Sequence, residues 1–331
     1  MQRHDVVIIG GGLAGSSCAL ELRLKGIDAV AFERDRFPRD KVCGAFLSPS
    51  ALQYLEELGL IDDVKNAGAM PMSCARVRGF GSDFTIPFER MAMGLSRRRL
   101  DALVAKCAGV HEGIAVRSVE DHGSCFIVGL PDGNDVSSRI VVDAAGKLSR
   151  FTARVAVEEF GIQCEDEESP VDRLDFWFFD DGYGGTCPVE GNRTNSCYLV
   201  KKSALRHWLD KRPDWLVTGR LAYERPPGAY ISAGDAAGMM DPFCGDGMAH
   251  ALASGLMAGR VIAHGLDRGW DYQRIRRTYD DQLTRQWRRK RMLSKVLRRA
   301  IQKRQIAPYL FRLAQSAPIL PTAFLRRVWA A

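Results

Sequence analysis

The stretch Asp5-Val-Val-Ile-Ile-Gly-Gly-Gly-Leu-Ala-Gly15 decides the fold, because an apolar strand runs directly into Gly10-x-Gly12-x-x-Gly15 and then into a helix-like segment ending at Gly26. Gly10 permits a tight turn, Gly12 lets the backbone approach a pyrophosphate, and Gly15 lets the helix pack against the strand. The unpaired N–H groups of the helix N-terminus then face the anion. The alternative for an isolated glycine fingerprint is a turn that caps an ordinary βα unit.

A second predicted strand favours the nucleotide interpretation. It runs from Asp28 to Phe32 and is followed by Glu33, 18 residues after Gly15. A carboxylate at this distance accepts hydrogen bonds from a ribose, and it favours an unphosphorylated ribose such as that of FAD or NAD. Strand, helix and acid together predict a dinucleotide site.

Composition limits the class of protein. A chain of 331 residues can bury a substantial core as one large domain or two closely joined ones. A strand beginning at residue 5 leaves no room for a signal peptide, and no apolar run reaches the roughly 18 residues of a spanning helix, so we expect a cytoplasmic protein. The nine cysteines form no C-x-x-C pair and the six histidines show no ligand spacing, which predicts reduced thiols and no metal.

The charge is concentrated at the C-terminal end of the chain. Residues 271–331 contain 16 Lys and Arg but only 3 Asp and Glu, a balance of +13, whereas residues 1–270 contain 31 against 37, a balance of −6. Apolar residues recur in this tail at three- and four-residue spacing: Tyr272, Ile275, Tyr279, Leu283, Trp287, Leu293, Val296, Leu297 and Ile301. The pattern predicts one or two long amphipathic helices with a basic face.

Three interpretations of this tail remain open. The helices pack on the body of the protein with a solvated basic face. Alternatively, they dock on an anionic membrane surface, which the apolar segments at 308–311 and 319–325 favour, because they alternate along the chain with basic residues such as Arg312 and Arg326. Nucleic-acid binding is the least favoured, because no recognition motif accompanies the charge.

The remaining patterns divide the chain into three parts. Helices are predicted over 48–59, with Ser48 as N-cap, and 95–108; strands over 113–119, 124–130 and 138–143; and a short antiparallel excursion over 74–93. Residues 151–227 alternate between apolar and polar positions with glycine turns, as in an antiparallel sheet. A buried strand from 228 to 235, a glycine-rich loop and a helix over 248–263 follow.

We therefore predict an α/β fold with an α+β substrate part. A discontinuous nucleotide-binding domain comprises residues 1–75, 94–150 and 228–265. A substrate-binding antiparallel-sheet domain comprises residues 76–93 and 151–227. Basic amphipathic helices occupy residues 266–331.

Four segments in order resemble a known family. They are Gly10 to Gly15, Lys41-Val-Cys-Gly-Ala-Phe-Leu-Ser-Pro49, Ser96-Arg97 followed by Leu100-Asp101, and Gly234-Asp-Ala-Ala-Gly-Met-Met-Asp-Pro-Phe-Cys-Gly-Asp-Gly247. Together they resemble FAD-dependent oxidoreductases of the geranylgeranyl reductase branch, in the wider group of p-hydroxybenzoate hydroxylase and the flavin halogenases. The resemblance spans residues 5 to about 265. It implies a Rossmann-like domain that binds FAD.

The resemblance also implies roles for single residues. Glu33 holds the adenosine ribose, Arg97 lies along the cofactor, and Asp235 binds the ribityl chain or pyrophosphate. Pro242 and the glycines that open the following helix aim backbone N–H groups at flavin N1 and the C2 carbonyl, which stabilises reduced flavin. The predicted cofactor-binding residues are Gly10, Gly12, Leu13, Ala14, Gly15, Glu33, Arg34, Cys43, Gly44, Arg97, Gly146, Gly234, Asp235, Pro242, Gly245, Gly247 and Met248.

The sequence departs from the family at two places. The second nucleotide motif reads Val142-Asp-Ala-Ala-Gly146, with Ala145 where the family usually has an acid, which puts the usual gating of NADPH in question. The stretch from Tyr183 to Pro188 lacks the tryptophan of the corresponding strand in reductases and halogenases. Halogenation is therefore not expected, and the resemblance does not establish that the substrate is a long prenyl chain. NADH or NADPH stays a candidate electron donor.

Two side chains are candidates for catalysis. The resemblance places Cys43 beside the flavin ring, where its thiol either donates a proton to substrate or simply lines the pocket. Tyr183 either acts as a phenolic proton donor or packs in the sheet. For His250, a structural role on a helix face is expected.

The leading functional prediction is an FAD-dependent oxidoreductase that exchanges hydride between flavin N5 and an apolar or aromatic small molecule, by reducing a C=C bond or by the reverse reaction. The aromatic run from Phe176 to Phe179 motivates such a ligand, although alternate positions also suit a sheet core. The alternatives are a flavin monooxygenase that hydroxylates an aromatic or polyketide-like substrate, and a non-catalytic flavin-binding partner protein.

Overall fold

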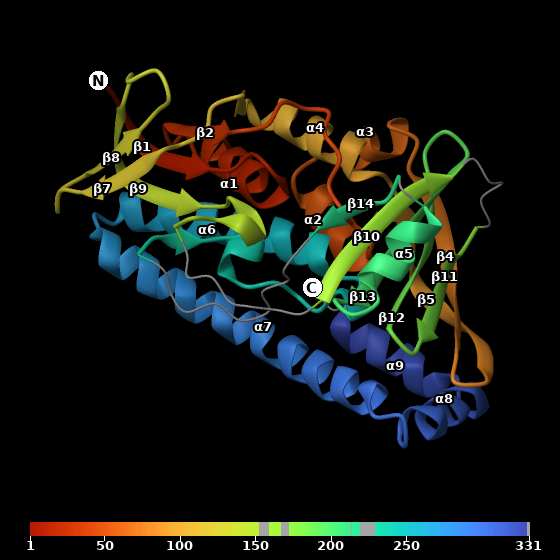
Figure 1. Cartoon of the computed structure of the whole chain (residues 1–331). Helices are drawn as coiled ribbons and strands as arrows, with labels where there is room; N and C mark the ends of the chain where they lie inside the picture. Colours follow the sequence, from red (N-terminus) through yellow and green to blue (C-terminus); the bar gives the residue numbers. More distant parts are fainter. Residues whose placement is uncertain (152–158, 167–171, 213, 219–228, 330–331) are drawn as a thin grey trace.

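The chain forms two β-sheets, and helices lie beside them (Figure 1). This computed structural model describes residues 1–151, 159–166, 172–212, 214–218 and 229–329. The predicted strand from 228 to 235 starts at the edge of a segment, 219–228, that lies outside the described residues.

The first sheet has seven strands in the order β6-β2-β1-β9-β8-β7, with β15 also paired to β9. Strands β1, β2, β6, β9 and β15 run parallel, whereas β8 pairs antiparallel with β9 and β7. The strands are β1 (Gln2–Ile9), β2 (Ala29–Glu33), β6 (His111–Glu112), β7 (Ser118–Asp121), β8 (Phe126–Gly129), β9 (Val136–Asp143) and β15 (Ile231–Ser232).

Alternate residues of β1 contribute to two cores. Val6 and Ile8 pack with α1 (Leu13–Leu24) and α6 (Gly247–Asp267), whereas Val7 and Ile9 pack with β8 and β9 on the other face. All four side chains are buried. A strand covered on both faces explains the continuous apolar run that precedes the glycine turn.

The second sheet has eight strands in the order β14-β10-β13-β12-β11-β4-β5-β3. They are β3 (Phe46–Leu47), β4 (Met70–Gly79), β5 (Ser82–Gly94), β10 (Glu159–Asp166), β11 (Leu174–Phe179), β12 (Gly182–Val189), β13 (Arg193–Lys201) and β14 (Leu216–Thr218). The pairs are antiparallel except for β4 and β11, which run parallel. These two strands come from distant parts of the chain, so no hairpin sets their relative direction.

The boundaries of this sheet differ from the predicted domain limits. β4 begins at Met70 and β3 lies at Phe46–Leu47, so the sheet takes in chain that the sequence pattern left in the nucleotide-binding part. Periodicity indicates that a strand exists, but the sheet it joins depends on long-range pairing.

Short helices follow strands of the second sheet. They are α2 (Pro49–Glu57), α3 (Ile61–Asn66), α4 (Arg97–Ala108) and α5 (Leu205–Lys211). Of these, α2, α3 and α5 lie between strands of the second sheet, whereas α4 leads from β5 of that sheet to β6 of the first. Ser48 caps α2 by accepting a hydrogen bond from the Ala51 N–H, and Ser96 caps α4 in the same way. The predicted helix with Ser48 as its N-cap is confirmed. Among the described helices, none has the length and hydropathy needed to cross a bilayer.

The basic tail forms one long helix and two short ones. They are α7 (Tyr272–Gln302), α8 (Ala307–Ser316) and α9 (Ile319–Val328). The first half of α7 packs on the first core through Ile275, Tyr279, Leu283 and Trp287, all of them buried. Its second half extends toward the second sheet, where α8 and α9 lie against β5 (Figure 1).

Candidate cofactor and substrate site

The glycine turn after β1 adopts a backbone that side chains would block. Gly10 has φ of +105°, and a Cβ on it would lie 2.4 Å from the Ala144 carbonyl oxygen. A Cβ on Gly15 would lie 1.8 Å from the Gly10 carbonyl oxygen. Gly12 is the N-cap of α1 and offers no side chain to its N–H groups. The helix N-terminus therefore stays open to an anionic ligand, as the motif requires.

Glu33 lies at the end of β2 and is 6% exposed. Its carboxylate accepts hydrogen bonds from the Gly11 N–H at 2.8 Å and the Asp35 N–H at 3.1 Å. Arg39 lies 3.7 Å from the same carboxylate. These contacts hold the acid beside the glycine turn, the place expected for a ribose-binding group.

Cationic side chains gather near this turn. Arg97 makes a bidentate, buried ion pair with Asp101 at 2.7 and 2.8 Å, and Arg39 lies 3.6 Å from the same carboxylate. Burial lowers the pKa of Lys41, and it lowers the pKa of Lys147 to about 8. Removing positive charge from water is unfavourable, and an anionic ligand would offset this cost. These buried and half-buried cations near the N-terminus of α1 therefore fit the diphosphate of FAD.

The loop that follows β15 closes the cofactor end from the other side. Gly234 has φ of +62°, and a Cβ on it would lie 2.9 Å from the Ala14 side chain, so the loop lies directly against α1. The Asp246 carboxylate accepts hydrogen bonds from Ser48 at 2.8 Å, Ser50 at 2.6 Å and Lys290 at 3.3 Å. These buried contacts fix the loop at the start of α6 to both α2 and α7.

A cavity of about 580 Å³ begins at this cofactor end and continues between the second sheet and the C-terminal helices. Its far part is almost wholly apolar. The residues there are Ala75, Val77, Phe84, Ile86 and Phe88 from β4 and β5, Leu174, Phe176 and Phe178 from β11, and Leu297, Ile301, Leu310, Phe311, Leu313, Leu320, Phe324, Leu325 and Trp329 from the C-terminal region. The cavity therefore joins a polar, cationic end to an apolar chamber.

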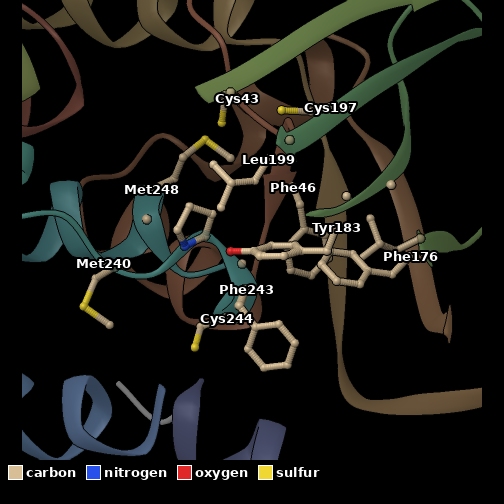
Figure 2. A pocket seen from close by; sticks show the side chains of 18 of the residues that line it. Cys43, Phe46, Phe176, Tyr183, Cys197, Leu199, Met240, Phe243, Cys244 and Met248 are labelled. Carbon is tan, nitrogen blue, oxygen red and sulfur yellow. The ribbon is translucent and has the colours of Figure 1, made fainter. Parts of the chain in front are cut away.

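Figure 2 shows the junction between the two parts. Tyr183 on β12 extends into it between Phe46 and Phe243 (Figure 2). The Tyr183 ring lies 5.8 Å from the Phe176 ring and 6.0 Å from the Phe243 ring, centre to centre. These aromatic side chains form a wall of the kind that receives a flat or apolar group.

The Tyr183 hydroxyl belongs to a polar chain that leads out of the cavity. It donates a hydrogen bond to Asp241 at 3.0 Å, and Arg298 of α7 lies 3.4 Å from the other oxygen of this carboxylate. Arg298 also pairs with Glu159. Burial raises the pKa of Asp241, against the opposing effect of Arg298. A phenol bonded to a buried carboxylate is a suitable group for holding or passing a proton.

Cys43 lines the cavity on the cofactor side. Its backbone N–H donates to Gln163 at 2.8 Å and its carbonyl accepts from Asn195 at 3.1 Å, so two strands of the second sheet hold the loop in place. The thiol lies near Arg97: burial lowers the pKa of this guanidinium, but Asp101 and, to a smaller extent, Cys43 raise it above its ordinary value. Cys197 lies near Cys43 in Figure 2 and lines the same cavity.

Most of the predicted cofactor-binding residues line this one cavity. They are Gly12, Leu13, Ala14, Cys43, Gly44, Arg97, Gly146, Gly234, Asp235, Pro242, Gly245, Gly247 and Met248, together with the catalytic candidate Tyr183. Gly10, Gly15 and Glu33 lie behind its wall and shape the turn. Arg34 does not line it: this side chain is 62% exposed and pairs with Asp35. Its role stays a prediction.

Sequence reasoning missed four polar residues of the site: Arg39, Lys41, Lys147 and Asp241. Three of them carried a signal, because Lys41 begins the Lys-Val-Cys-Gly segment, Lys147 directly follows Gly146, and Asp241 directly precedes Pro242 in the segment from Gly234 to Gly247. Arg39 carried none, since only the fold brings it to Glu33, and the contact of Asp241 with Tyr183 could not be read from the sequence.

Two further residues behave as structural groups. His250 is fully buried, its ring meets that of Trp287 edge-on at 4.6 Å, and burial lowers its pKa to about 4. Ala145 is exposed, whereas the nearby Asp143 is buried and accepts hydrogen bonds from Ser149 at 2.7 Å and the Ala145 N–H at 3.1 Å. Among the described residues, no group of three or more His, Cys, Asp or Glu side chains is placed to hold a metal ion.

Comparison with known proteins places this site in a class. Residues 3–154 match the profile of the family described as FAD binding domain. The chain is 26% identical to a menaquinone reductase of Mycolicibacterium smegmatis, over 80% of this chain and 77% of the relative. It shares its fold with a flavin-dependent brominase (TM-score 0.79, 21% identity, 99% and 94% of the two chains) and with P. aeruginosa PqsL bound to 2-aminobenzoylacetate (TM-score 0.79, 17% identity, 94% and 100%).

The chain is an FAD-dependent oxidoreductase whose residues 3–154 match an FAD binding domain. FAD is its cofactor, and it is an enzyme, so the alternative of a non-catalytic flavin-binding partner is set aside. The predicted Rossmann-like fold with a separate substrate sheet is confirmed. The finer placement in the geranylgeranyl reductase branch stays a prediction.

Proposed function

We propose that this enzyme transfers hydride between FAD and a C=C bond of an apolar, ring-bearing lipid, of which a prenylated quinone is the model substrate. The observation that carries the proposal is the single cavity that joins the cationic cofactor end to the apolar chamber. An apolar wall binds hydrocarbon without specific polar contacts. The relative named menaquinone reductase, which aligns with most of this chain, supports a quinone-type ligand.

When bound, FAD supplies two-electron hydride transfer at N5. Saturating one C=C bond requires one hydride and one proton, and two side chains of this protein are placed to supply the proton. Tyr183 lies at the junction of the two parts of the cavity and is bonded to Asp241. Cys43 lies on the cofactor side and is the second candidate. An external two-electron donor, for which we propose NADH or NADPH, completes the balance.

A monooxygenase that hydroxylates an aromatic ring is the second candidate function. The aromatic wall of Phe176, Phe178, Tyr183 and Phe243 favours it, because such rings stack on a flat substrate. An FAD-dependent urate hydroxylase is 28% identical over 44% of this chain. The aromatic ligand in the structure of PqsL is consistent with this alternative.

One experiment separates the two reactions. The reduced, FAD-loaded protein is mixed with a menaquinone in two arms: in one, air is excluded until the reaction is complete, and in the other, air is present throughout. After both mixtures have been exposed to air, the mass of the lipid is measured by mass spectrometry. Air converts a quinol back to the quinone, so a lasting gain of two hydrogen atoms reports a saturated C=C bond. Gain of an oxygen atom, only when air is present during turnover, supports the monooxygenase. An unchanged lipid in both arms contradicts the quinone-type substrate.

A further inference from the structure

Exposed apolar side chains are concentrated in the C-terminal part of the chain. Of the twelve large apolar side chains that are exposed in the described chain, seven fall between residues 292 and 320. We call them the α7–α9 face: Met292, Val296, Ile306, Tyr309, Leu313, Ile319 and Leu320. Tyr309 and Ile319 are 71% and 75% exposed. Because α8 contacts both α7 and α9, these side chains lie on neighbouring helices, and exposed apolar side chains gathered in this way are typical of an interaction site.

The same segment is strongly basic. Residues 282–331 contain 13 Lys and Arg and no Asp or Glu. Arg299, Lys303, Arg312 and Arg327 are exposed and are interspersed in sequence with the apolar residues of the α7–α9 face. Apolar side chains flanked by Lys and Arg are the composition of helices that lie in the interface of anionic membranes.

The apolar chamber reaches the surface at this face. Leu313 of α8 and Leu320 of α9 both line the cavity, yet they are 52% and 48% exposed. Phe311 and Phe324 of the same two helices line it further in. The apolar lining is therefore continuous from the interior to the α7–α9 face, between two short helices that end the chain.

We propose that the α7–α9 face docks on an anionic phospholipid bilayer and that an apolar substrate passes from the bilayer into the cavity between α8 and α9. Charge favours a bilayer over a second copy of this chain, because a symmetric contact through this face would bring basic side chains together. Anionic headgroups, in contrast, complement them. The lipid class of the substrate rests on the proposed function, but the docking itself does not.

The test measures sedimentation of the full-length, FAD-loaded protein with vesicles. One set contains phosphatidylcholine alone, and the other contains about 30% phosphatidylglycerol. We expect binding to the anionic set at low salt, weaker binding as salt rises, and little binding to the neutral set. Tyr309→Glu and Ile319→Glu should each weaken binding by about tenfold or more, because each removes an apolar contact and adds repulsion.

Leu24→Glu is the matched control. Leu24 is 69% exposed at the end of α1, so the same change of side chain there should leave vesicle binding unaltered. Flavin absorbance and circular dichroism check that the variants are folded. The inference is overturned if the protein binds neither vesicle set or binds both sets equally. It is also overturned if Leu24→Glu weakens vesicle binding as much as Ile319→Glu does. A third contrary outcome is that the wild-type protein is a dimer in the absence of lipid and Ile319→Glu converts it to a monomer.

The proposed docking and the proposed function can be contradicted independently of each other. A protein that ignores vesicles but converts detergent-dispersed menaquinone contradicts the docking alone. A protein that binds anionic vesicles and leaves menaquinone unchanged contradicts the proposed substrate alone.

Discussion

Tyr183 is the side chain whose surroundings most resemble those of a proton donor. It faces the cavity, its hydroxyl donates to Asp241, and burial raises the pKa of that carboxyl. Because Arg298 lies 3.4 Å from Asp241, a charge on α7 helps to set how strongly the carboxylate holds the phenol proton. A tyrosine that only packed in the sheet would have no need of this buried polar chain.

We expect Tyr183→Phe to lower kcat by about 100-fold without loss of bound FAD, since general acid catalysis contributes about that much. Asp241→Asn keeps the shape of the side chain but removes its charge, and it should lower kcat less and shift its pH profile. Tyr309→Phe, at an exposed position away from the cavity, is the control. Full kcat in Tyr183→Phe would assign the proton to another group, and Cys43→Ala then becomes the next variant to measure.

The pKa of Lys147 predicts how FAD binding depends on pH. Its pKa of about 8 lies below the ordinary value of 10.5, mainly because of burial. The unfolded chain therefore binds more protons than the folded chain between these values, so the FAD-free protein gains stability as the pH rises from about 8 toward 10.5. The affinity for FAD should change with pH in the opposite direction. Because the diphosphate favours the charged lysine, FAD binding weakens as the pH rises and the lysine loses its proton.

We expect the affinity of the FAD-free protein for FAD to fall by about tenfold between pH 7 and pH 10, as measured by titration of flavin fluorescence. Lys147→Arg keeps the charge over this range and should flatten the dependence. Lys147→Gln should also flatten it, but at the weaker affinity. A wild-type affinity that does not change with pH would show that Lys147 lies too far from the diphosphate to matter.

Among the elements, α7 joins the two halves of the molecule. Its first half packs on α6 through side chains such as Trp287, which is fully buried against His250. Further along, Lys290 and Arg298 reach Asp246 and Asp241 in the loop at the cofactor end. The helix thus supports the loop at the predicted cofactor end, in addition to forming part of the cavity wall through Leu297.

Trp287→Ala should lower the free energy of unfolding by about 3–5 kcal/mol, because it leaves a large cavity between α6 and α7. The measurement is the urea midpoint, with FAD content as a second readout, since loss of this packing should also loosen the loop. Arg288→Ala, on the exposed side of the same helix, should change stability by less than about 0.5 kcal/mol. If the two changes lowered the free energy of unfolding equally, Trp287 would not make the buried contact between α6 and α7 that the structure shows.

At the scale of the whole molecule, we expect the cavity to determine which substrates the enzyme selects. Three separate parts of the chain build its apolar chamber: β4 and β5, β11, and the C-terminal region. A chamber whose lining is almost wholly apolar distinguishes ligands by the amount of hydrocarbon that they bury. Chain length should therefore influence affinity more than any single polar contact.

For a series of quinones with increasing alkyl chains, we expect binding to improve by about fourfold per added methylene until the chamber is filled, which corresponds to about 0.8 kcal/mol each. Competition assays with the FAD-loaded protein measure this slope. Phe324→Trp narrows the chamber and should make the series level off at a shorter chain, whereas Tyr309→Trp, which is exposed, should not. A flat series would mean that the apolar chamber does not receive the chain.

Local sequence was sufficient to predict the glycine turn, the acid after β2 and the helix caps. The turn from Gly10 to Gly15, the acid at Glu33 and the helix caps depend on contacts within a few tens of residues, and the backbone geometry of such turns admits few residue types. The alternation of the aromatic run also follows from the pleat, because Phe176 and Phe178 line the cavity while Phe179 packs with Trp208 on the other face. The pattern did not show which face holds the ligand.

Only the tertiary structure decided the rest. It placed Arg39 rather than Arg34 beside Glu33, joined β4 to β11 in parallel, and brought Asp241 to Tyr183 across 58 residues of chain. It also showed that the basic tail both packs on the core and closes the cavity. The physical reason is that burial and ion pairing depend on neighbours distant in sequence, whereas turns, caps and amphipathic faces are set by residues close along the chain.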